Sequence, residues 1–411
     1  MIANTLILYI DPGTGSMLFS ILIALSTTIF FGARSCLIKL KNIARNGKRS
    51  NGDKANLGIV IYTDSKRYWN VFGPIAEEFE RRQKPLTYYT QSPDDPALGA
   101  GFKHVKAQFI GEGNKGIAKM NFLNAEVCLS TTPSLEVYQW KRSKTVKRYV
   151  HIPHTVDDLS GYRLFGIDFY DEVLTSGDNQ NALIKTLEGI RPNINKKKLV
   201  TVGSTYLDAM QERAAASAQR QNKKKVVLVA PSWGKSGILS RYGDKLLTAL
   251  AKSQKFEVIV RPHPQTVVSE KEILDPLLQK HKNVEWNFDN DNFAALSKAD
   301  ILITDFSGII FDYSFIFDKP LIYADTNFDP APYDAYYLKE PMWSLQALPK
   351  IGVKLEEKDF DRIDALIQET LSDNSLRQNR QKLKDEAWQN RGGAAKAVAD
   401  YLLDIQNKEA Q

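Results

Sequence analysis

The sequence predicts an α/β protein in which each half of the chain forms a doubly wound parallel sheet, behind an N-terminal membrane segment. From Leu57 onward, short apolar strands alternate with helical stretches, and this alternation occurs twice, on either side of the basic spacer 218–225. The strands are apolar throughout rather than at every second position, which is typical of parallel sheets covered on both faces. Two such sheets indicate two Rossmann-like domains, whose ligands bind at the carboxyl ends of the strands. We therefore expect a substrate cleft between the halves.

The elements of each half follow from the same periodicities. The expected strands of the first half are 57–63, 86–90, 105–110, 125–131, 147–150, 171–176 and 198–203. A helix follows the first strand, because Phe72, Ile75, Ala76 and Phe79 share one helical face. The expected strands of the second half are 226–232, 257–263, 283–288, 299–305 and 320–325, with helices at 244–252, 270–281, 292–297 and 308–317. The tail from Lys358 is helical and amphipathic, which would let it pack back onto the first half.

These patterns divide the chain into four parts. Residues 1–41 form the membrane anchor and the polar stretch 42–56 forms a linker. Residues 57–220 form the N-terminal Rossmann-like domain, and residues 221–411 form the C-terminal one together with the helical tail.

The anchor rests on the uncharged run 17–33, which lies at the short end of the range for a membrane-spanning helix. Basic residues and no acid follow this run as far as Gly52, so the positive-inside rule places the body of the protein on the cytoplasmic side of a bacterial inner membrane. A cleaved signal peptide is disfavoured, because its basic residues would precede the apolar run. Monotopic insertion and a re-entrant hairpin stay open, since Pro12 and Gly13 interrupt the earlier apolar stretch.

Composition restricts the partners. The chain has 411 residues, 43% of them hydrophobic and 25% charged, with a formal net charge of +7. This mild excess suits an anionic partner such as a phospholipid surface, a nucleotide or a polyphosphate, and no nucleic-acid-binding motif accompanies it. The two cysteines, Cys36 and Cys128, predict neither a disulfide framework nor a thiolate metal site.

The first candidate for chemistry is Arg261-Pro262-His263-Pro264, directly after the strand EVIV. This position puts a guanidinium and an imidazole at the carboxyl end of a strand, and the prolines stiffen the turn that aims them. The guanidinium offers fixed donors to a diphosphate, while the imidazole can donate a hydrogen bond or a proton. A rigid turn with an incidental histidine is the alternative.

The second candidate is Thr304-Asp305-Phe306-Ser307-Gly308, between the strand ADILI and a helix that begins near Gly308. Free backbone N–H groups at a helix N-terminus, together with the helix dipole, form an anion site. An ordinary N-cap by Asp305 or Ser307 is the alternative, and both readings are compatible.

The third candidate is His151-Ile152-Pro153-His154-Thr155, which follows the strand KRYV and precedes Asp157 and Asp158. One interpretation is a catalytic base with a carboxylate that orients it. A metal pair and a structural turn are the alternatives. The metal interpretation is weak, because this histidine spacing is not specific and no third ligand stands out.

Two further segments, Ser232 in APSWG and Gly203-Ser204-Thr205, follow strands and are placed to line the cleft. Ser232 lacks the G-x-S-x-G elbow of serine hydrolases. The glycines form neither a P-loop nor a full G-x-G-x-x-G, so neither ATP nor NAD is supported, and we expect no cofactor and no metal.

Taken in order, VGSTYLD (202–208), the strand followed by RPHP, and ADILITDFSGIIFDYSFIFDKPLIYAD (299–325) resemble the CDP-glycerol glycerophosphotransferase family of teichoic-acid polymerases and primases. The resemblance covers roughly residues 145–340. It implies a glycosyltransferase-B-like fold without a catalytic metal. It also implies transfer of a phosphoglycerol-type unit from a CDP-activated donor to a lipid-linked or polymeric acceptor.

Carried onto this sequence, the resemblance implies that His263 contacts the donor phosphates or protonates the leaving group. Arg261, Ser307 and the backbone near Gly308 would hold the diphosphate, and His154 would take the proton of the acceptor hydroxyl. The family usually has Trp-His-Gly-Thr at this histidine, where Pro153-His154-Thr155 stands here.

Two alternatives belong to other classes. A nucleotide-sugar glycosyltransferase would use the same diphosphate site, and VGSTYLDAM is similar to a segment of UDP-N-acetylglucosamine 2-epimerases, although their His-Arg-Glu-Asn motif is absent. A non-catalytic scaffold of a polysaccharide assembly complex is the second alternative, which the presence of the arginine, histidine and serine set disfavours.

Overall fold

The computed structural model describes residues 26–27, 29, 32–33, 56–191, 194–217, 224–289, 291–324 and 328–409. The expected anchor (1–41) and linker (42–56) lie almost entirely outside these residues. No helix of the described residues is both long enough and apolar enough to cross a bilayer. Residues 56–411 form one compact unit, which contains two parallel sheets.

The first sheet has seven strands in the order β3-β2-β1-β4-β5-β6-β7, all pairing in parallel. Its strands are β1 (Ile59–Thr63), β2 (Leu86–Thr90), β3 (Val105–Phe109), β4 (Asn124–Ser130), β5 (Thr145–His151), β6 (Glu172–Thr175) and β7 (Lys198–Thr201). The helices of this half are α2 (Trp69–Arg81), α3 (Asn114–Met120), α4 (Asp178–Ile190) and α5 (Thr205–Ala216). Three short 3-10 helices accompany them: η1 (Lys66–Tyr68), η2 (Pro96–Gly99) and η3 (Leu159–Gly161).

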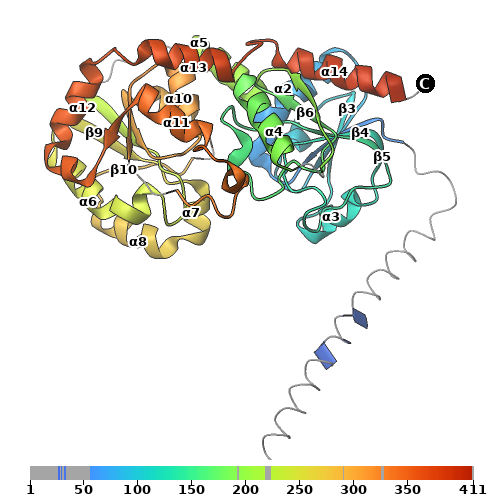
Figure 1. Ribbon diagram of the computed structural model, residues 1–411, viewed down its shortest axis with the longest axis horizontal. Coiled ribbons are helices and arrows are strands. Elements are labelled where there is room, and N and C mark those ends of the chain that lie inside the picture. The colour runs from blue at the N-terminus through green and yellow to red at the C-terminus, as the bar shows by residue number, and fades with distance from the viewer. Residues whose placement is uncertain are drawn as a thin grey trace, which may run out of the picture. The chain divides into compact units, whose positions relative to one another are not determined.

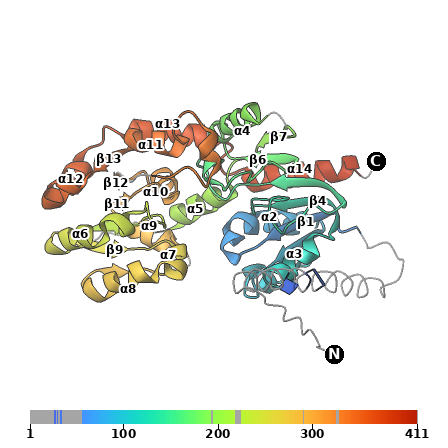
Figure 2. The same ribbon diagram turned by 60° about the horizontal axis from the view of Figure 1, so that its bottom comes forward.

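The second sheet has six parallel strands in the order β10-β9-β8-β11-β12-β13, which can be followed in Figure 2 from β13 through β12 and β11 to β9. Its strands are β8 (Lys225–Val229), β9 (Phe256–Val260), β10 (Glu285–Trp286), β11 (Ile301–Thr304), β12 (Leu321–Ala324) and β13 (Gly352–Leu355). The helices that follow the first strands are α6 (Ile238–Lys252), α7 (Pro264–Ser269), α8 (Lys271–Lys280), α9 (Phe293–Lys298) and α10 (Ile309–Phe317). The later ones are η4 (Asp334–Tyr337), α11 (Trp343–Ile351), η5 (Glu357–Arg362), α12 (Ile363–Ser372), α13 (Arg377–Ala387) and α14 (Ala394–Glu409).

The predicted fold class, with two Rossmann-like parallel sheets, is confirmed. In each sheet the strand order reverses between the first and fourth strands of that half, β1 and β4 in one and β8 and β11 in the other. Doubly wound sheets bind ligands beside such reversals, at the carboxyl ends of the strands. The expected sites therefore lie after Thr63 and Ser130 in one sheet and after Val229 and Thr304 in the other.

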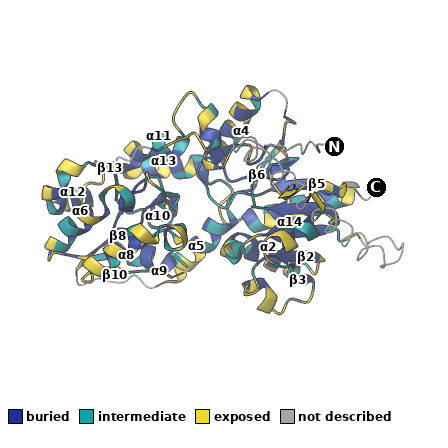
Figure 3. Cartoon of the chain, turned by 90° about the horizontal axis from the view of Figure 1, so that it is seen from below, coloured by how far each residue is buried: buried dark blue, intermediate teal, exposed yellow. Residues whose placement is uncertain are grey.

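The central strands of each sheet are buried between helical layers, whereas the edge strands β3, β7 and β10 carry exposed residues; Figure 3 colours the chain by this burial. Val60 and Ile61 of β1 are both 0% exposed although they point to opposite faces, which explains why the strands are apolar throughout. Helix α14 belongs to the core of the first half, because Val398 and Leu402 pack with Phe72 of α2. Figure 1 shows α14, in red, running along the first half beside α2.

Several element boundaries differ from the sequence prediction. Helix α6 begins at Ile238 rather than at Asp244, because the buried Asp305 carboxylate accepts a hydrogen bond of 2.9 Å from the Ile238 backbone N–H and so caps the helix from the neighbouring strand. The expected helix 270–281 is α8, Lys271–Lys280. It is preceded by a separate short helix, α7, which was not predicted and which His263 caps with Pro264 at its first position. Strand β13 is short and mixed in polarity, and the sequence analysis did not predict it.

Candidate functional site

The first wall of the candidate site is the segment that follows β5, where His154 lies in an aromatic enclosure. Its ring centroid lies 5.1 Å from that of Tyr68 and 6.1 Å from the nearly parallel ring of Tyr162. Its Nδ1 lies 3.4 Å from Oγ1 of Thr131, at the end of β4. Burial, with a further contribution from the charge of Arg67, lowers the pKa of His154 to about 4. The imidazole is therefore neutral at pH 7, as a general base requires.

His151 occupies a different place from His154, although the two residues are close in sequence. Its side chain is 0% exposed, its Nε2 lies 3.2 Å from the Tyr162 hydroxyl, and its ring packs on Tyr170. Burial, with a contribution from His154, lowers the pKa of His151 to about 3. His151 thus lies behind the enclosure of His154, in the core of the first half, where a substrate cannot contact it.

The second wall carries His263, at the end of β9. Its Nδ1 accepts a 3.1 Å hydrogen bond from the backbone N–H of Gln265, so the neutral ring carries its proton on Nε2. Its ring lies 6.4 Å from that of Trp233, at an angle of 30°. Burial, followed by the charges of Arg67 and Arg261, lowers the pKa of His263 to about 4. At neutral pH His263 is a hydrogen-bond donor through Nε2–H.

The loop before α10 is organised by Asp305, whose carboxylate is 0% exposed. One oxygen accepts from the backbone N–H and the hydroxyl of Ser232, at 2.9 and 2.5 Å, and from the N–H of Ser307 at 3.2 Å. The other oxygen caps α6. Thr304 is equally buried and donates its hydroxyl to the Ala230 carbonyl at 2.7 Å. These groups hold the loops after β8 and β11 together, and their polar atoms are already paired within the protein.

Ser307 and Gly308 remain partly accessible at the N-terminus of α10. A Cβ atom added to Gly308 would lie 3.5 Å from Oγ1 of Thr155 and 3.7 Å from Oδ2 of Asp157. The segment that carries His154 therefore faces the start of α10 across the two halves. Free backbone N–H groups and the positive end of the helix dipole make this point suited to an anion.

Arg261 is 7% exposed, and its guanidinium is engaged by the loop after β10. It donates to Oδ1 of Asn287 and, at 2.8 Å, to the Asp289 carbonyl. Two of its five donors are thereby directed to the protein, which makes Arg261 a support of this loop.

Asp157 adds a carboxyl group at the start of α10. Burial, followed by the negative charges of Asp158 and Asp312, raises the pKa of Asp157 to about 8. The carboxyl group is therefore largely protonated at pH 7, which removes its repulsion toward an anion at Gly308. Asp158, by contrast, is tied into the structure, since it accepts from the Ser160 hydroxyl at 2.7 Å and the Trp343 N–H at 2.6 Å.

The described residues contain no group of three or more histidine, cysteine, aspartate or glutamate side chains that could hold a metal ion.

The sequence analysis missed Arg67 and Tyr68, which follow β1 and form part of η1. Tyr68 packs against His154, and the charge of Arg67 acts on both His154 and His263. The signal that pointed to Arg261, a polar segment directly after a buried strand, was also present here.

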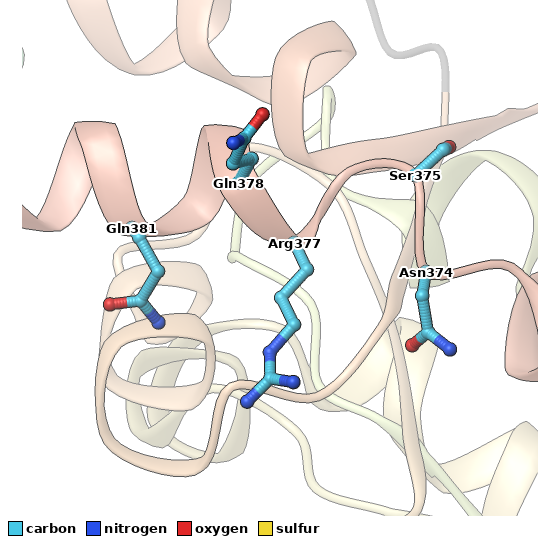
Figure 4. Close-up of a pocket in the computed structure, with 5 residues that line it drawn as sticks. All are labelled: Asn374, Ser375, Arg377, Gln378 and Gln381. Carbon is cyan, nitrogen blue, oxygen red and sulfur yellow. The ribbon is translucent and has the colours of Figure 1, made fainter.

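A pocket lined by Asn374, Ser375, Arg377, Gln378 and Gln381 lies elsewhere (Figure 4). Arg377 pairs at 2.6 Å with Asp318, the residue that follows the last residue of α10. This pocket is therefore at the opposite end of α10 from Gly308.

The fold is of the doubly wound, two-domain class, with one parallel sheet in each half. The family model described as CDP-Glycerol:Poly(glycerophosphate) glycerophosphotransferase matches residues 180–400, which is more than half of the 411 residues. The chain belongs to this family of enzymes. His263 and Ser307 lie within the matched residues, whereas His154 precedes them.

Solved structures share the fold at low sequence identity. The wall teichoic acid polymerase TagF is 14% identical, with a TM-score of 0.57 over 92% of this chain and 98% of that one. The UDP-GlcNAc 2-epimerase from Neisseria meningitidis bound to UDP-GlcNAc is 15% identical, with a TM-score of 0.53 over 84% of this chain and 100% of that one. S. aureus MnaA, solved with UDP, is 12% identical, with a TM-score of 0.54 over 85% and 97% of the two chains. Among curated proteins, none matches the chain.

Proposed function

We propose that the protein transfers a glycerol phosphate unit from CDP-glycerol to a lipid-linked or polymeric glycerophosphate acceptor, in the synthesis of a bacterial cell-surface polymer. The observation that carries this proposal is the approach of the two walls. Thr155, next to His154, and Asp157 lie within 3.7 Å of the position of a Cβ on Gly308, at the start of α10. A base from one half and an anion-binding helix N-terminus from the other thus face each other.

His154 is the proposed base. When its Nδ1–H donates to Oγ1 of Thr131, Nε2 keeps a lone pair for the proton of the acceptor hydroxyl. The hydroxyl oxygen then attacks the phosphorus that carries the glycerol, and a new phosphorus–oxygen bond forms. The bond between this phosphorus and the bridging oxygen breaks, and CMP leaves with the bond's electron pair. The proton of the hydroxyl remains on His154 until solvent removes it.

The donor diphosphate is proposed to bind at the N-terminus of α10. The hydroxyl of Ser307 and the free backbone N–H groups beginning at Gly308 are the donors, and the helix dipole adds to them. His263 donates from Nε2–H to a phosphate oxygen and so stabilises the charge that develops on the leaving group. Since a phosphate leaving group carries this charge without protonation, a neutral His263 is sufficient.

The other predicted site residues are assigned supporting roles. Asp305, Ser232 and Thr304 hold the two loops that shape the diphosphate site, because their polar atoms are paired with one another or with the backbone. Arg261 holds the loop after β10 through Asn287 and Asp289. His151 is assigned a packing role behind His154, since it is fully buried.

We further propose that the acceptor binds to the first half and the nucleotide to the second. The N-terminal segment 1–41 and its basic flank would hold the enzyme at the cytoplasmic face of the membrane, where a lipid-linked acceptor is found.

Ligand binding tests the proposal. The thermal unfolding of the full-length chain is measured with CDP-glycerol, CDP, CMP, UDP-GlcNAc, UDP and ATP. A ligand at about 100 times its Kd stabilises the folded state by about 2.7 kcal/mol. We expect stabilisation by the cytidine diphosphates. A response to uridine compounds alone, or to none of these ligands, would refute the proposal.

A further inference from the structure

The loop between β1 and α2 occupies the point of strand reversal in the first sheet, where β1 lies between β2 and β4. Doubly wound sheets place ligands at this point. The loop contains η1, which consists of Lys66, Arg67 and Tyr68.

The backbone of this loop is held in place by short side chains. The Thr63 hydroxyl donates to the Ser65 carbonyl at 2.9 Å, and the Ser65 hydroxyl caps η1 by accepting from the Arg67 N–H. The Lys66 N–H donates to the Ser92 hydroxyl at 2.9 Å. The Lys66 side chain is paired with Asp94, which leaves Arg67 as the unpaired cation of η1.

The Arg67 side chain is exposed but ordered by its neighbours. Its Nε donates to the Ser65 hydroxyl at 3.1 Å, and its guanidinium carbon lies 5.8 Å from the centre of the Tyr68 ring. The Tyr68 ring lies 5.1 Å from His154. Within the described residues, the two terminal nitrogens of Arg67 have no hydrogen-bond partner. They therefore remain available to a ligand.

The charge of Arg67 acts on a histidine of each half. It lowers the pKa of His154, on the first half, and that of His263, on the second, in each case after burial. The Asp64 carboxyl lies on the same loop, where burial raises its pKa and the charge of Arg67 lowers it in part. The Arg67 guanidinium lies beside Tyr68, whose ring packs on His154, so its positive charge is placed where a phosphate next to His154 would lie.

We infer that Arg67 is a phosphate-binding residue, whose two free terminal nitrogens hold a phosphate oxygen pair between His154 and His263. This inference rests on the proposed function and adds a ligand-binding group to the same site. A planar guanidinium binds phosphate through two parallel hydrogen bonds, which an ammonium cannot do. The phosphate belongs either to the donor diphosphate or to the phosphodiester of the acceptor.

The placement of Arg67 is tested without substrate. The pKa values of the histidine rings in the full-length chain are measured by NMR for the wild type, Arg67→Gln and the control Arg81→Gln. Arg81 is exposed at the other end of α2. When it is replaced, its ion-pair partner Glu78 still has an ion pair with Arg82. We expect Arg67→Gln to raise the pKa of His154 and of His263, and Arg81→Gln to leave both unchanged. Unchanged values in Arg67→Gln would overturn the placement.

The phosphate role is tested by binding and kinetics with the same variants. Loss of a charge-assisted bidentate contact is expected to weaken phosphate binding roughly 10- to 100-fold. A rise in the Kd of CDP and CDP-glycerol identifies the donor as the source, whereas an unchanged donor Kd with a raised acceptor KM identifies the acceptor. Arg67→Lys is expected to recover only part of the loss. Unchanged donor and acceptor constants in Arg67→Gln would refute the inference.

Pyrophosphate separates this inference from the proposed function. If the wild type binds no cytidine nucleotide, the proposed function fails. Weaker pyrophosphate binding by Arg67→Gln than by Arg81→Gln would then still support an anion subsite at Arg67, and equal binding would overturn it.

Discussion

The pH dependence of catalysis follows from the enclosure of His154. Burial among Tyr68, Tyr162 and Thr131, together with the charge of Arg67, lowers the pKa of His154 to about 4. At pH 5.5 an imidazole with the ordinary pKa of about 6.5 is neutral in roughly one molecule in ten. His154 is neutral in nearly all molecules at this pH. The account therefore predicts kcat/KM at pH 5.5 close to its value at pH 7, where an unperturbed base would lose about tenfold.

The assay is CMP release by the full-length chain at low donor concentration and saturating acceptor, between pH 5 and 8. This regime reports the ionisation of the enzyme before the donor binds. Activity on return to pH 7 after each incubation controls for acid unfolding. His154→Ala should abolish the reaction throughout. An acidic limb centred near pH 6.5 in the wild type would refute the assignment of His154 as a base with a lowered pKa.

Three further predictions concern the start of α10. The wild type should lose activity above about pH 8, where Asp157 ionises, and Asp157→Asn should keep its activity there. At pH 8 and above, Asp157→Asn should also unfold at a higher denaturant concentration than the wild type, because the folded wild type disfavours the ionised carboxylate. This stability difference should shrink as the pH falls from 8 and should vanish below about pH 4, where the wild-type carboxyl is protonated in both the folded and the unfolded state. Gly308→Ala should change the free energy of unfolding by less than about 1 kcal/mol, since its new contacts are of ordinary length, but should weaken CDP binding measured by calorimetry. Asp305→Ala should destabilise the protein by about 3 kcal/mol or more in urea denaturation, because it leaves buried donors without an acceptor; a loss below 1 kcal/mol would contradict that role.

The sequence was sufficient to predict the central strands of both sheets, because these strands are buried on both faces. A continuous apolar run such as that in β1 or β8 is recognisable without any tertiary information. The start of α6 was not predictable in this way. Its cap is the carboxylate of Asp305, which is distant in sequence and reaches Ile238 only in the folded protein.

The candidate site was predicted in outline, since RPHP and TDFSG both follow strands. Which residue of each motif is buried and which is accessible to a ligand was not predictable. His151 and His154 are three residues apart, yet one is enclosed in the core and the other is partly accessible. Asp305 is likewise fully buried and paired with Ser232 and Ile238, whereas Ser307 is partly accessible, and both depend on contacts that form only in the folded protein.

The most direct test of the account is the stoichiometry of transfer. The full-length chain is incubated with CDP-glycerol labelled in its glycerol and a lipid-linked glycerophosphate acceptor, and free CMP and polymer-bound label are counted. The account predicts one CMP for each glycerol phosphate added, and neither product with His154→Ala. CMP release without label in the acceptor, or turnover of UDP-GlcNAc in place of CDP-glycerol, would contradict it.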